Sequence, residues 1–432
     1  MSNITTLLTA TLALGWSLRA QTVDDTELKQ VIIVGRHSVR APLLPNSTLD
    51  TFSTRPFPDF GVQPQYLTPN GSAAEKLLGG YFRLWLTQEG LLTGNDAADA
   101  KLTYVRANNF ERTIATAQAF ASGLLPAATI TVDSLSQGSD PLFDPIGAGV
   151  AELDTNMELA ALQGRVGGNA QLLATAYGAE LALTRSLLFN YPPTQTPPPD
   201  TPKGKTDVTA LPIAIGTGSP ANFGGISLVE ILTSTFLMEY ADGLPLTDVA
   251  WGQLNADGIS QLARLTTLTL DLEFRTPYLD QIQSSNLASH VVRSLSQFAS
   301  GTASAGSLGT PQTKIIVLIA SDVNVTGLAA LFNLDWTLPG YQENLCSPGG
   351  ALVFQLRQSQ STKDYIVRAS YIAQGLDQLR NKTALTLSTP PEIAPLFIPG
   401  CSINNATFDC PLTNLMTLAN QAIDPHSADP VN

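Results

Sequence analysis

A histidine flanked by two arginines directly follows an apolar run near the start of the chain. Residues 36–40 are Arg-His-Ser-Val-Arg, and Val31-Ile-Ile-Val34 precedes them. The neutral imidazole of His37 can attack phosphorus and carry a phosphoryl group covalently. The guanidinium groups of Arg36 and Arg40 match phosphate oxygens in geometry and charge. The pattern predicts a nucleophile among phosphate ligands. The alternative is a surface Arg-His pair after a core strand.

Two further side chains could complete such a site. Arg112 lies where a helix is predicted to begin, after a predicted strand at 102–105, and helix N-termini favour anions. Taken alone, Arg112 could equally be a solvated charge paired with Glu111. Asp322 follows the apolar run 314–320 and could protonate a leaving alkoxide, an effect worth about 10²–10⁴-fold in rate. Asp322 could also be the N-cap of the next helix.

The elements that position these residues are predicted from apolar runs and their ends. Residues 31–34 are apolar and β-branched and are followed by Gly35, which predicts a buried strand of a parallel sheet. In open α/β sheets, ligands bind at the carboxyl ends of the strands. A helix is predicted with Thr68 as its N-cap, Pro69 at its first position and Gly90 at its end. The fold class predicted for the chain is α/β.

The length and composition allow two domains. The chain has 432 residues, of which 44% are hydrophobic and 14% charged. Alanine- and leucine-rich stretches predict a mainly helical cap at 146–265. This cap would be inserted into an α/β domain formed by 23–145 and 266–432. His290, in a predicted helix, and His426, near the C-terminus, are expected to be structural or solvated.

Charge and the N-terminal segment bear on partners and location. The net charge of −13 argues against nucleic acid or an anionic membrane as a partner, so a phosphate site must be a local positive region. Residues 1–20 contain an apolar stretch from Leu7 to Trp16 and a small residue, Ala20, which predicts a signal peptide. A buried amphipathic helix is the alternative. The stretch is shorter than the ~20 residues that a bilayer requires, so no membrane association is expected after cleavage.

Three cysteines fit an exported protein. Cys401 and Cys410 lie in a turn-rich segment and could form a disulfide that closes a small loop, with two free thiols as the alternative. Cys346 has no basic neighbour in sequence to activate it, so we expect a buried thiol rather than a nucleophile.

These residues together resemble a known family, the histidine acid phosphatases, and most closely its bacterial periplasmic branch of phytases and glucose-1-phosphatases. The matching segments, in chain order, are 36–42, 67–71, 111–113, 140–145, 275–277, 334–340, 348–350 and the loop between Cys401 and Cys410. The resemblance implies a phosphoglycerate-mutase-like fold, with a mostly parallel sheet flanked by helices and an inserted, mainly helical cap. It also implies a periplasmic or secreted enzyme for a small-molecule phosphate ester, with neither a metal nor an organic cofactor.

The resemblance further implies a role for each candidate residue. The nucleophile would be His37, the phosphate ligands Arg36, Arg40 and Arg112, and the general acid Asp322. Arg275 resembles a residue that lines the substrate pocket beside the cap.

Three positions depart from the family pattern. Ser38 stands where Gly is usual, although some glucose-1-phosphatase-like members also lack that Gly. Leu44 stands where phytases have Lys, which favours a sugar phosphate or another monoester over phytate. Ser321 replaces the His of the family's His-Asp pair, which donates to the developing oxyanion. Losing one such donor lowers kcat by a factor on the order of 10²–10³.

The expected function is therefore that of an exported phosphomonoesterase that forms a phosphohistidine on His37 and turns over slowly because of Ser321. One alternative is a non-catalytic phosphate-ester binder that has kept the pocket. Another is a transferase of the phosphoglycerate mutase type, which shares the Arg-His nucleophile. Export, the large cap and the cysteine loop argue against the transferase.

Overall fold

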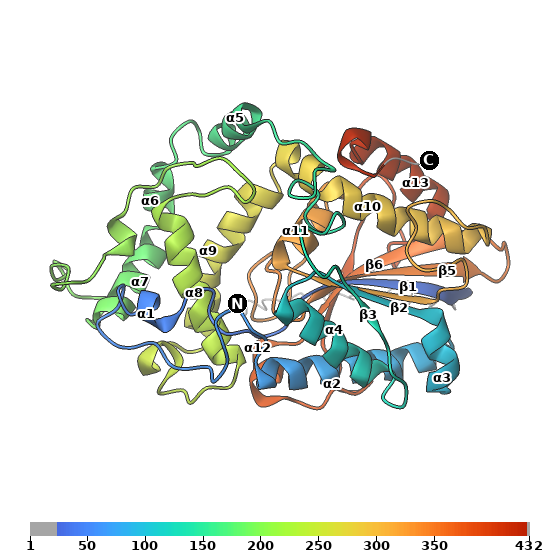
Figure 1. The fold of residues 1–432 in the computed structure, drawn as a ribbon, viewed down its shortest axis with the longest axis horizontal. Coiled ribbons are helices and arrows are strands. Elements are labelled where there is room, and N and C mark those ends of the chain that lie inside the picture. Colours follow the sequence, from blue (N-terminus) through green and yellow to red (C-terminus); the bar gives the residue numbers. More distant parts are fainter. Residues whose placement is uncertain (1–23, 430–432) are drawn as a thin grey trace, which may run out of the picture.

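The fold divides into an α/β part and a helical cap (Figure 1). A computed structural model describes residues 24–429. The predicted signal peptide at 1–20 lies outside the described residues. Within 24–429, every helix is too short or too polar to cross a membrane.

The α/β part is built on one mixed sheet with a parallel core. Its strands are β1 (Thr26–Arg36), β2 (Thr103–Ala107), β3 (Val132–Asp133), β4 (Ile315–Ala320), β5 (Ala351–Ser359), β6 (Tyr365–Ala373), β7 (Glu392–Leu396) and β8 (Cys410–Pro411). Their order is β3-β2-β4-β1-β5-β6-β7, and β8 pairs with β6. Strands β3, β2, β4 and β1 are parallel, whereas β5, β6, β7 and β8 pair antiparallel. The predicted α/β sheet is confirmed.

The parallel core aligns the strand ends that carry the candidate residues. Arg36, the last residue of β1, pairs with Ala320, the last residue of β4. Ala107, the last residue of β2, pairs with Ile319 of β4. The residues that follow these three strands therefore meet at one edge of the sheet.

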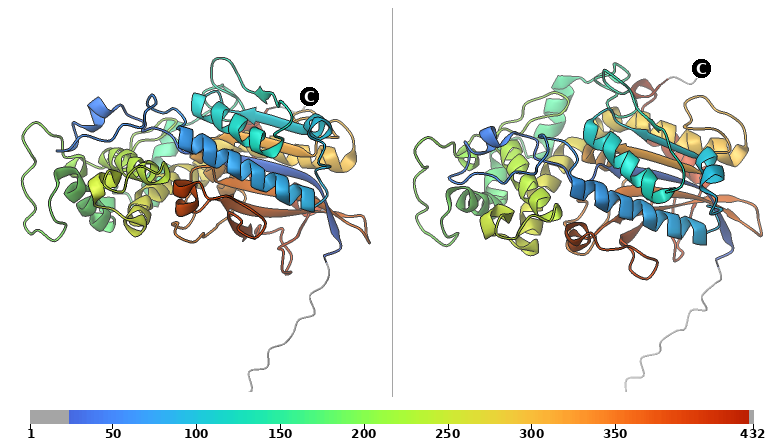
Figure 2. Two further views of the ribbon diagram at one scale, coloured as in Figure 1. Left: turned by 90° about the horizontal axis from the view of Figure 1, so that it is seen from below. Right: turned by 60° about the horizontal axis from the view of Figure 1, so that its bottom comes forward.

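Helices cover both faces of the sheet because its central strands are buried on both sides (Figure 2). Val31 and Ile33 of β1 pack toward helices α2 (Pro69–Gln88) and α4 (Glu111–Leu124). Ile32 and Val34 face the opposite core, which contains residues of α10 (Pro277–Ser300) and α11 (Asp322–Leu331). This alternation follows from the two-residue period of a strand, and apolar residues at every position satisfy both faces.

Two predicted helix starts can be compared with the structure. The Thr68 side chain accepts a hydrogen bond from the Gly71 N–H, which confirms Thr68 as the N-cap of α2. At α11 the prediction was wrong, because the N-cap is Ser321 and Asp322 is the first helical residue. The Ser321 backbone is extended and leaves β4, so it is the last residue before helical geometry begins.

The cap consists of helices joined by long loops. These helices are α5 (Thr155–Arg165), α6 (Leu172–Ala176), α7 (Gly178–Phe189), α8 (Gly225–Ala241) and α9 (Ala256–Phe274). The segment around the short helix α1 (Asn46–Leu49) also packs on the cap (Figure 1). There the Phe57 ring stacks on Phe236 of α8 with 5.9 Å between centroids.

The C-terminal region packs against both the α/β part and the cap. Here helix α13 (Leu412–Ala422) packs on α10 and β6, and helix α12 (Leu376–Asn381) packs on α8 and α2. A disulfide joins Cys401 to Cys410, where β8 begins, as predicted. Cys346 is a buried free thiol, and burial raises its pKa to about 12, which confirms that it is not an activated nucleophile.

Candidate active site

His37 is fixed at the end of β1 by backbone hydrogen bonds to its neighbours. Its N–H donates to the Ala320 carbonyl at 2.8 Å, and its carbonyl accepts from the Gly349 N–H at 3.1 Å. The imidazole is buried, and its Nδ1 lies 2.8 Å from the Ser38 carbonyl oxygen. Because a carbonyl oxygen only accepts, Nδ1 carries the proton. The lone pair is therefore on Nε2, the form in which an imidazole is a nucleophile.

The surroundings keep this imidazole neutral. Burial lowers the pKa of His37 well below its ordinary value, and the positive charges of Arg112, Arg36 and Arg40 lower it further. A protonated His37 would be a fourth positive charge in a buried cluster. His37 therefore stays neutral at mildly acidic pH, where an ordinary histidine would be charged.

Three guanidinium groups surround His37, and two of them have no anionic partner. Arg36 Nη2 lies 2.9 Å from Asp322 Oδ2. Arg40 and Arg112 are buried, yet no carboxylate within residues 24–429 lies within 4.0 Å of either. Burial, followed by the charges of Arg36 and Arg112, lowers the pKa of Arg40 to about 9. Because a buried charge is costly without a counter-ion, this cluster favours a bound anion.

Arg112 is the second residue of α4, as predicted. Its alternative partner is engaged elsewhere, since Glu111 Oε2 accepts a hydrogen bond from the Leu67 N–H at 2.9 Å. The Arg112 guanidinium instead lies over the Phe110 ring, 4.5 Å from its centroid. The start of α4 is tied to the His37 loop through Thr116, whose Oγ1 accepts from the Ser38 N–H and donates to the Arg112 carbonyl.

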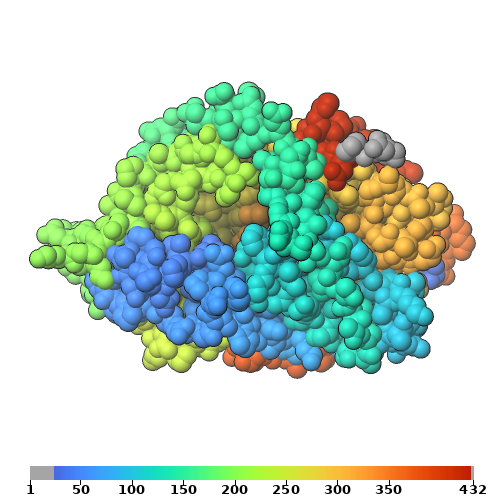
Figure 3. Space-filling model, in the orientation of Figure 1, coloured from blue at the N-terminus to red at the C-terminus, as the bar shows by residue number. Residues whose placement is uncertain are grey.

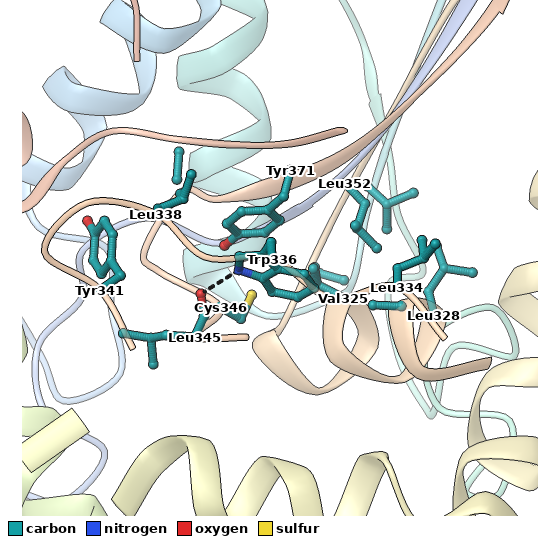
Figure 4. Close-up of a cluster of buried hydrophobic side chains, with 14 of the residues drawn as sticks. Val325, Leu328, Leu334, Trp336, Leu338, Tyr341, Leu345, Cys346, Leu352 and Tyr371 are labelled. Carbon is teal, nitrogen blue, oxygen red and sulfur yellow. Dashed lines mark hydrogen bonds between the residues drawn. The ribbon is translucent and has the colours of Figure 1, made fainter. Parts of the chain in front are cut away.

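A loop before β5 contacts Arg36, and Figure 4 shows the buried side chains of this loop. The Arg36 guanidinium donates to the Cys346 carbonyl oxygen. Trp336 of this loop stacks on Tyr371 of β6 at 4.2 Å, and its indole N–H donates to the Leu345 carbonyl at 3.2 Å. The Tyr371 hydroxyl accepts from the Ser347 N–H, so the aromatic pair holds the residues on both sides of Cys346, whose carbonyl contacts Arg36.

Ser321 and Asp322 lie beside this cluster, where β4 passes into α11. The Ser321 N–H donates to Asn324 Oδ1 at 3.2 Å, and Asn324 Nδ2 donates to the Phe143 carbonyl at 2.7 Å. This arrangement fixes the turn that carries both residues. The serine hydroxyl can donate a hydrogen bond to an oxyanion, but it carries no charge.

Arg275 borders a different cavity from Ser321, and its role as a residue of the substrate pocket stays a prediction. Its guanidinium pairs with Asp335 at 2.5 Å and borders a separate cavity of about 260 Å³ with Tyr177 and Arg264. Helix α9 ends at Phe274, and successive residues at a helix end point in different directions. Phe274, rather than Arg275, lines the cavity that contains Ser321.

Glu230 is a site residue that sequence reasoning missed. It lies on α8 of the cap, and its Oε1 accepts from Thr266 Oγ1 at 3.1 Å. Burial, followed by the charge of Asp322, raises its pKa to about 7, whereas Arg40 and Arg36 act in the opposite sense. The only available sequence signal was that Glu230 is one of two glutamates in a helix that is otherwise apolar and hydroxylic.

The other two histidines lie apart from the cluster, as expected. His290 is on α10 and pairs with Asp429 at 3.2 Å, and His426 is exposed in a short 3-10 helix. Residues 24–429 contain no group of three or more His, Cys, Asp or Glu side chains that could hold a metal.

The cluster lies where the cap meets the α/β part. Figure 3 shows a recess between these two parts of the molecule. The site combines a neutral imidazole, two unpaired guanidinium groups and a nearby carboxyl. These groups are suited to binding a phosphate ester and to nucleophilic displacement at phosphorus.

Comparison with known proteins agrees with this chemistry. Residues 27–159 match the family described as "Histidine phosphatase superfamily (branch 2)". Phytase AppA of Escherichia coli is 30% identical over 415 residues, which cover 94% of each protein. A glucose-1-phosphatase of Salmonella typhimurium is 27% identical, covering 94% of this chain and 95% of the relative.

Solved structures show the same likeness. A Hafnia alvei phytase in complex with tartrate superposes with a TM-score of 0.85 at 29% identity, covering 94% of this chain and 100% of that one. The same phytase in complex with myo-inositol hexakis sulphate gives a TM-score of 0.83 at 28% identity over the same shares.

Proposed function

This chain belongs to branch 2 of the histidine phosphatase superfamily, and on that premise we propose that it is an exported phosphomonoesterase that works through a phosphohistidine on His37. The observation that carries the proposal is the cluster of buried Arg40 and Arg112 beside a neutral imidazole. The two guanidinium groups leave a positive charge that a phosphate group would neutralise.

In the first step, Nε2 of His37 attacks the phosphorus of the ester. The P–N bond forms as the P–O bond to the alcohol breaks, and the alkoxide takes a proton from the protonated form of Asp322, whose other oxygen still accepts from Arg36. Arg36, Arg40 and Arg112 hold the three non-bridging oxygens, whose charge is spread over them in the transition state. The Ser321 hydroxyl can donate to one of these oxygens.

In the second step, water attacks the phosphohistidine. The P–N bond breaks, inorganic phosphate leaves, and the water proton returns to Asp322. His37 is restored as a neutral imidazole, which its low pKa favours. Neither step requires a metal or an organic cofactor.

We propose a sugar phosphate or a similar monoester as the substrate. Leu44 packs against the apolar core and supplies no cation near the site. Arg275 pairs with Asp335 and borders a separate cavity, so it adds no cation to the arginine cluster. Both placements favour a substrate with one phosphate over one with many.

Export is part of the proposal. The disulfide between Cys401 and Cys410 suits an oxidising compartment, either the periplasm or the medium. We expect the N-terminal sequence of the protein recovered from that compartment to begin near residue 21. Recovery of full-length protein in the cytoplasm alone would contradict export.

The test of the chemistry is trapping of a labelled phosphoenzyme from a phosphomonoester by an alkaline quench, in which a phosphohistidine is stable, with His37→Ala as the variant. We expect label on His37 in the parent protein and neither label nor turnover in the variant. His426→Ala is the matched control because His426 is exposed and remote, so its turnover should equal that of the parent. Turnover that persists in His37→Ala would contradict the proposal.

The second candidate function is that of a non-catalytic binder of phosphate esters, which Ser321 favours because serine supplies a weaker oxyanion donor than histidine. A binder would take up a phosphate ester without turnover and would gain none in Ser321→His. A transferase of the mutase type would pass the label to an added alcohol in preference to water. Release of inorganic phosphate as the main product would exclude both alternatives.

A further inference from the structure

A cavity of about 370 Å³ adjoins the phosphate cluster, and we name it the Ser321 cavity after the residue through which it meets the site. Ser321 directly precedes Asp322, the partner of Arg36. The cavity also touches Phe110, whose ring lies under the Arg112 guanidinium at 4.5 Å. Two of its lining residues therefore adjoin residues of the phosphate cluster.

The walls of the Ser321 cavity suit a ring with an apolar face. Three phenylalanine rings line it, from Phe110, Phe143 and Phe274. Amide and hydroxyl side chains, among them Asn108 and Gln283, supply polar contacts between the rings. Its volume falls in the range of small-molecule sites, which are mostly apolar with a few polar groups.

The charges in the Ser321 cavity are unsuited to a second anion. Its lining contains no lysine, arginine or histidine, but it contains the carboxylates Asp140 and Asp144. Asp140 is already paired with Arg106 at 2.9 Å, and Asp144 accepts a hydrogen bond from the Gly147 N–H at 2.9 Å. A second phosphate or carboxylate here would be desolvated beside negative charge and would lack a cation.

Ser321 is the lining residue that directly precedes Asp322 of the site. A serine side chain is small, and the cavity extends to it at the carboxyl end of β4. An imidazole at this position would fill part of the space beside Asp322. The residue that weakens the oxyanion site thus also makes room for a leaving group.

We propose that the Ser321 cavity holds the alcohol portion of the phosphate ester and selects a ring-sized alcohol that carries no second anionic group. This inference deepens the proposed function and rests on its phosphate site. A substrate would place its phosphate among the arginines and its ring between Phe110 and Phe274.

The test is equilibrium binding by calorimetry to the whole protein, which requires no turnover. The probes are inorganic phosphate, benzylphosphonate and 4-carboxybenzylphosphonate, which differ by a ring and then by one carboxylate. We expect benzylphosphonate to bind at least about tenfold more tightly than phosphate, on the order expected for burying a ring. We expect 4-carboxybenzylphosphonate to bind at least about tenfold more weakly than benzylphosphonate.

Two variants locate the effect. Phe274→Ala should remove most of the extra affinity for benzylphosphonate while leaving the affinity for inorganic phosphate unchanged. Phe397→Ala is its control, because Phe397 is 48% exposed and lies outside the lining of the cavity. Asp144→Asn keeps an acceptor for the Gly147 N–H, so it should fold normally, and it should reduce the discrimination against the carboxylate at least about threefold.

The outcomes separate this inference from the proposed function. Equal affinities for benzylphosphonate and 4-carboxybenzylphosphonate would overturn the cavity inference, even if esters are hydrolysed. So would a Phe274→Ala variant that still binds benzylphosphonate more tightly than phosphate by the same factor as the parent. The expected affinities without turnover of any ester would uphold the cavity inference and overturn the proposed hydrolysis.

Discussion

The Arg36 guanidinium and the Asp322 carboxylate form an ion pair with 2.9 Å between Nη2 and Oδ2. The pair joins the end of β1 to the first residue of α11, across the two parallel strands at the centre of the sheet. It neutralises one of the three guanidinium groups and orients the carboxyl proposed as the general acid. Arg40 and Arg112 keep their charge for the phosphate.

Removing the Asp322 carboxylate should affect both stability and turnover. Asp322→Ala leaves Arg36 buried without its partner, so we expect the free energy of unfolding to fall by about 1–3 kcal/mol. Asp322→Asn keeps an oxygen that can accept from Arg36, so its free energy of unfolding should fall by less. In both variants kcat for an alkyl phosphate should fall by about 10²–10⁴-fold, because the alkoxide leaves without a proton.

Urea denaturation and steady-state kinetics measure these two effects. An aryl phosphate with a good leaving group is the internal control, since it needs less protonation and should lose less activity in either variant. An equal loss of kcat on both esters would contradict the role of Asp322 as the general acid.

Glu230 should make substrate binding depend on pH near neutrality. Burial, followed by the charge of Asp322, raises its pKa to about 7, so the side chain is neutral below that pH and negative above it. As the pH rises from 6 to 8, the new charge opposes a phosphate dianion, and KM should rise. Glu230→Gln should remove this rise and leave KM at pH 6 unchanged.

The control for this prediction lies on the same helix. Burial raises the pKa of Glu239 to about 8, but its carboxylate accepts from the Ala250 N–H, away from the arginines. Glu239→Gln should leave the pH dependence of KM as in the parent protein. If Glu230→Gln and the parent gave the same KM profile, Glu230 would have no part in phosphate binding.

The sequence was informative where local pattern determines position. The short, β-branched apolar runs before Arg36 and Asp322 predict buried strands, and parallel pairing then aligns their ends, so these residues meet. Arg112 was predictable because an arginine in the first turn of a helix after a strand faces the same edge. Most of the fold and the core of the site therefore follow from residues adjacent in sequence.

Local pattern was uninformative where position depends on distant contacts. Arg275 follows the last residue of α9, and its direction is set by Asp335 on another loop. Glu230 reaches the cluster from the cap, which no local motif reveals. Similarly, Thr116 links Ser38 to Arg112 only once α4 packs beside the His37 loop.

The disulfide should contribute to stability without affecting the chemistry. Cys401 and Cys410 are separated by 9 positions, and a cross-link of this length restricts the unfolded chain by about 2–3 kcal/mol. The double variant Cys401→Ala and Cys410→Ala should lose about that much free energy of unfolding at unchanged kcat. Cys346→Ala, which touches no disulfide, is the control for cysteine loss. A fall in kcat in the double variant would contradict the prediction.

Ser321→His should act in opposite directions on two substrates. An imidazole next to Asp322 adds an oxyanion donor, so we expect kcat for a small alkyl phosphate to rise by about 10²-fold. The same side chain occupies the opening of the Ser321 cavity, so KM for an aryl phosphate should also rise. Kinetics on both esters, with Ser321→Asn as a polar variant of intermediate size, separate the two effects. A parallel change on both substrates would mean that Ser321 acts on the phosphate alone. No change in kcat on either ester would mean that the side chain at position 321 does not stabilise the oxyanion.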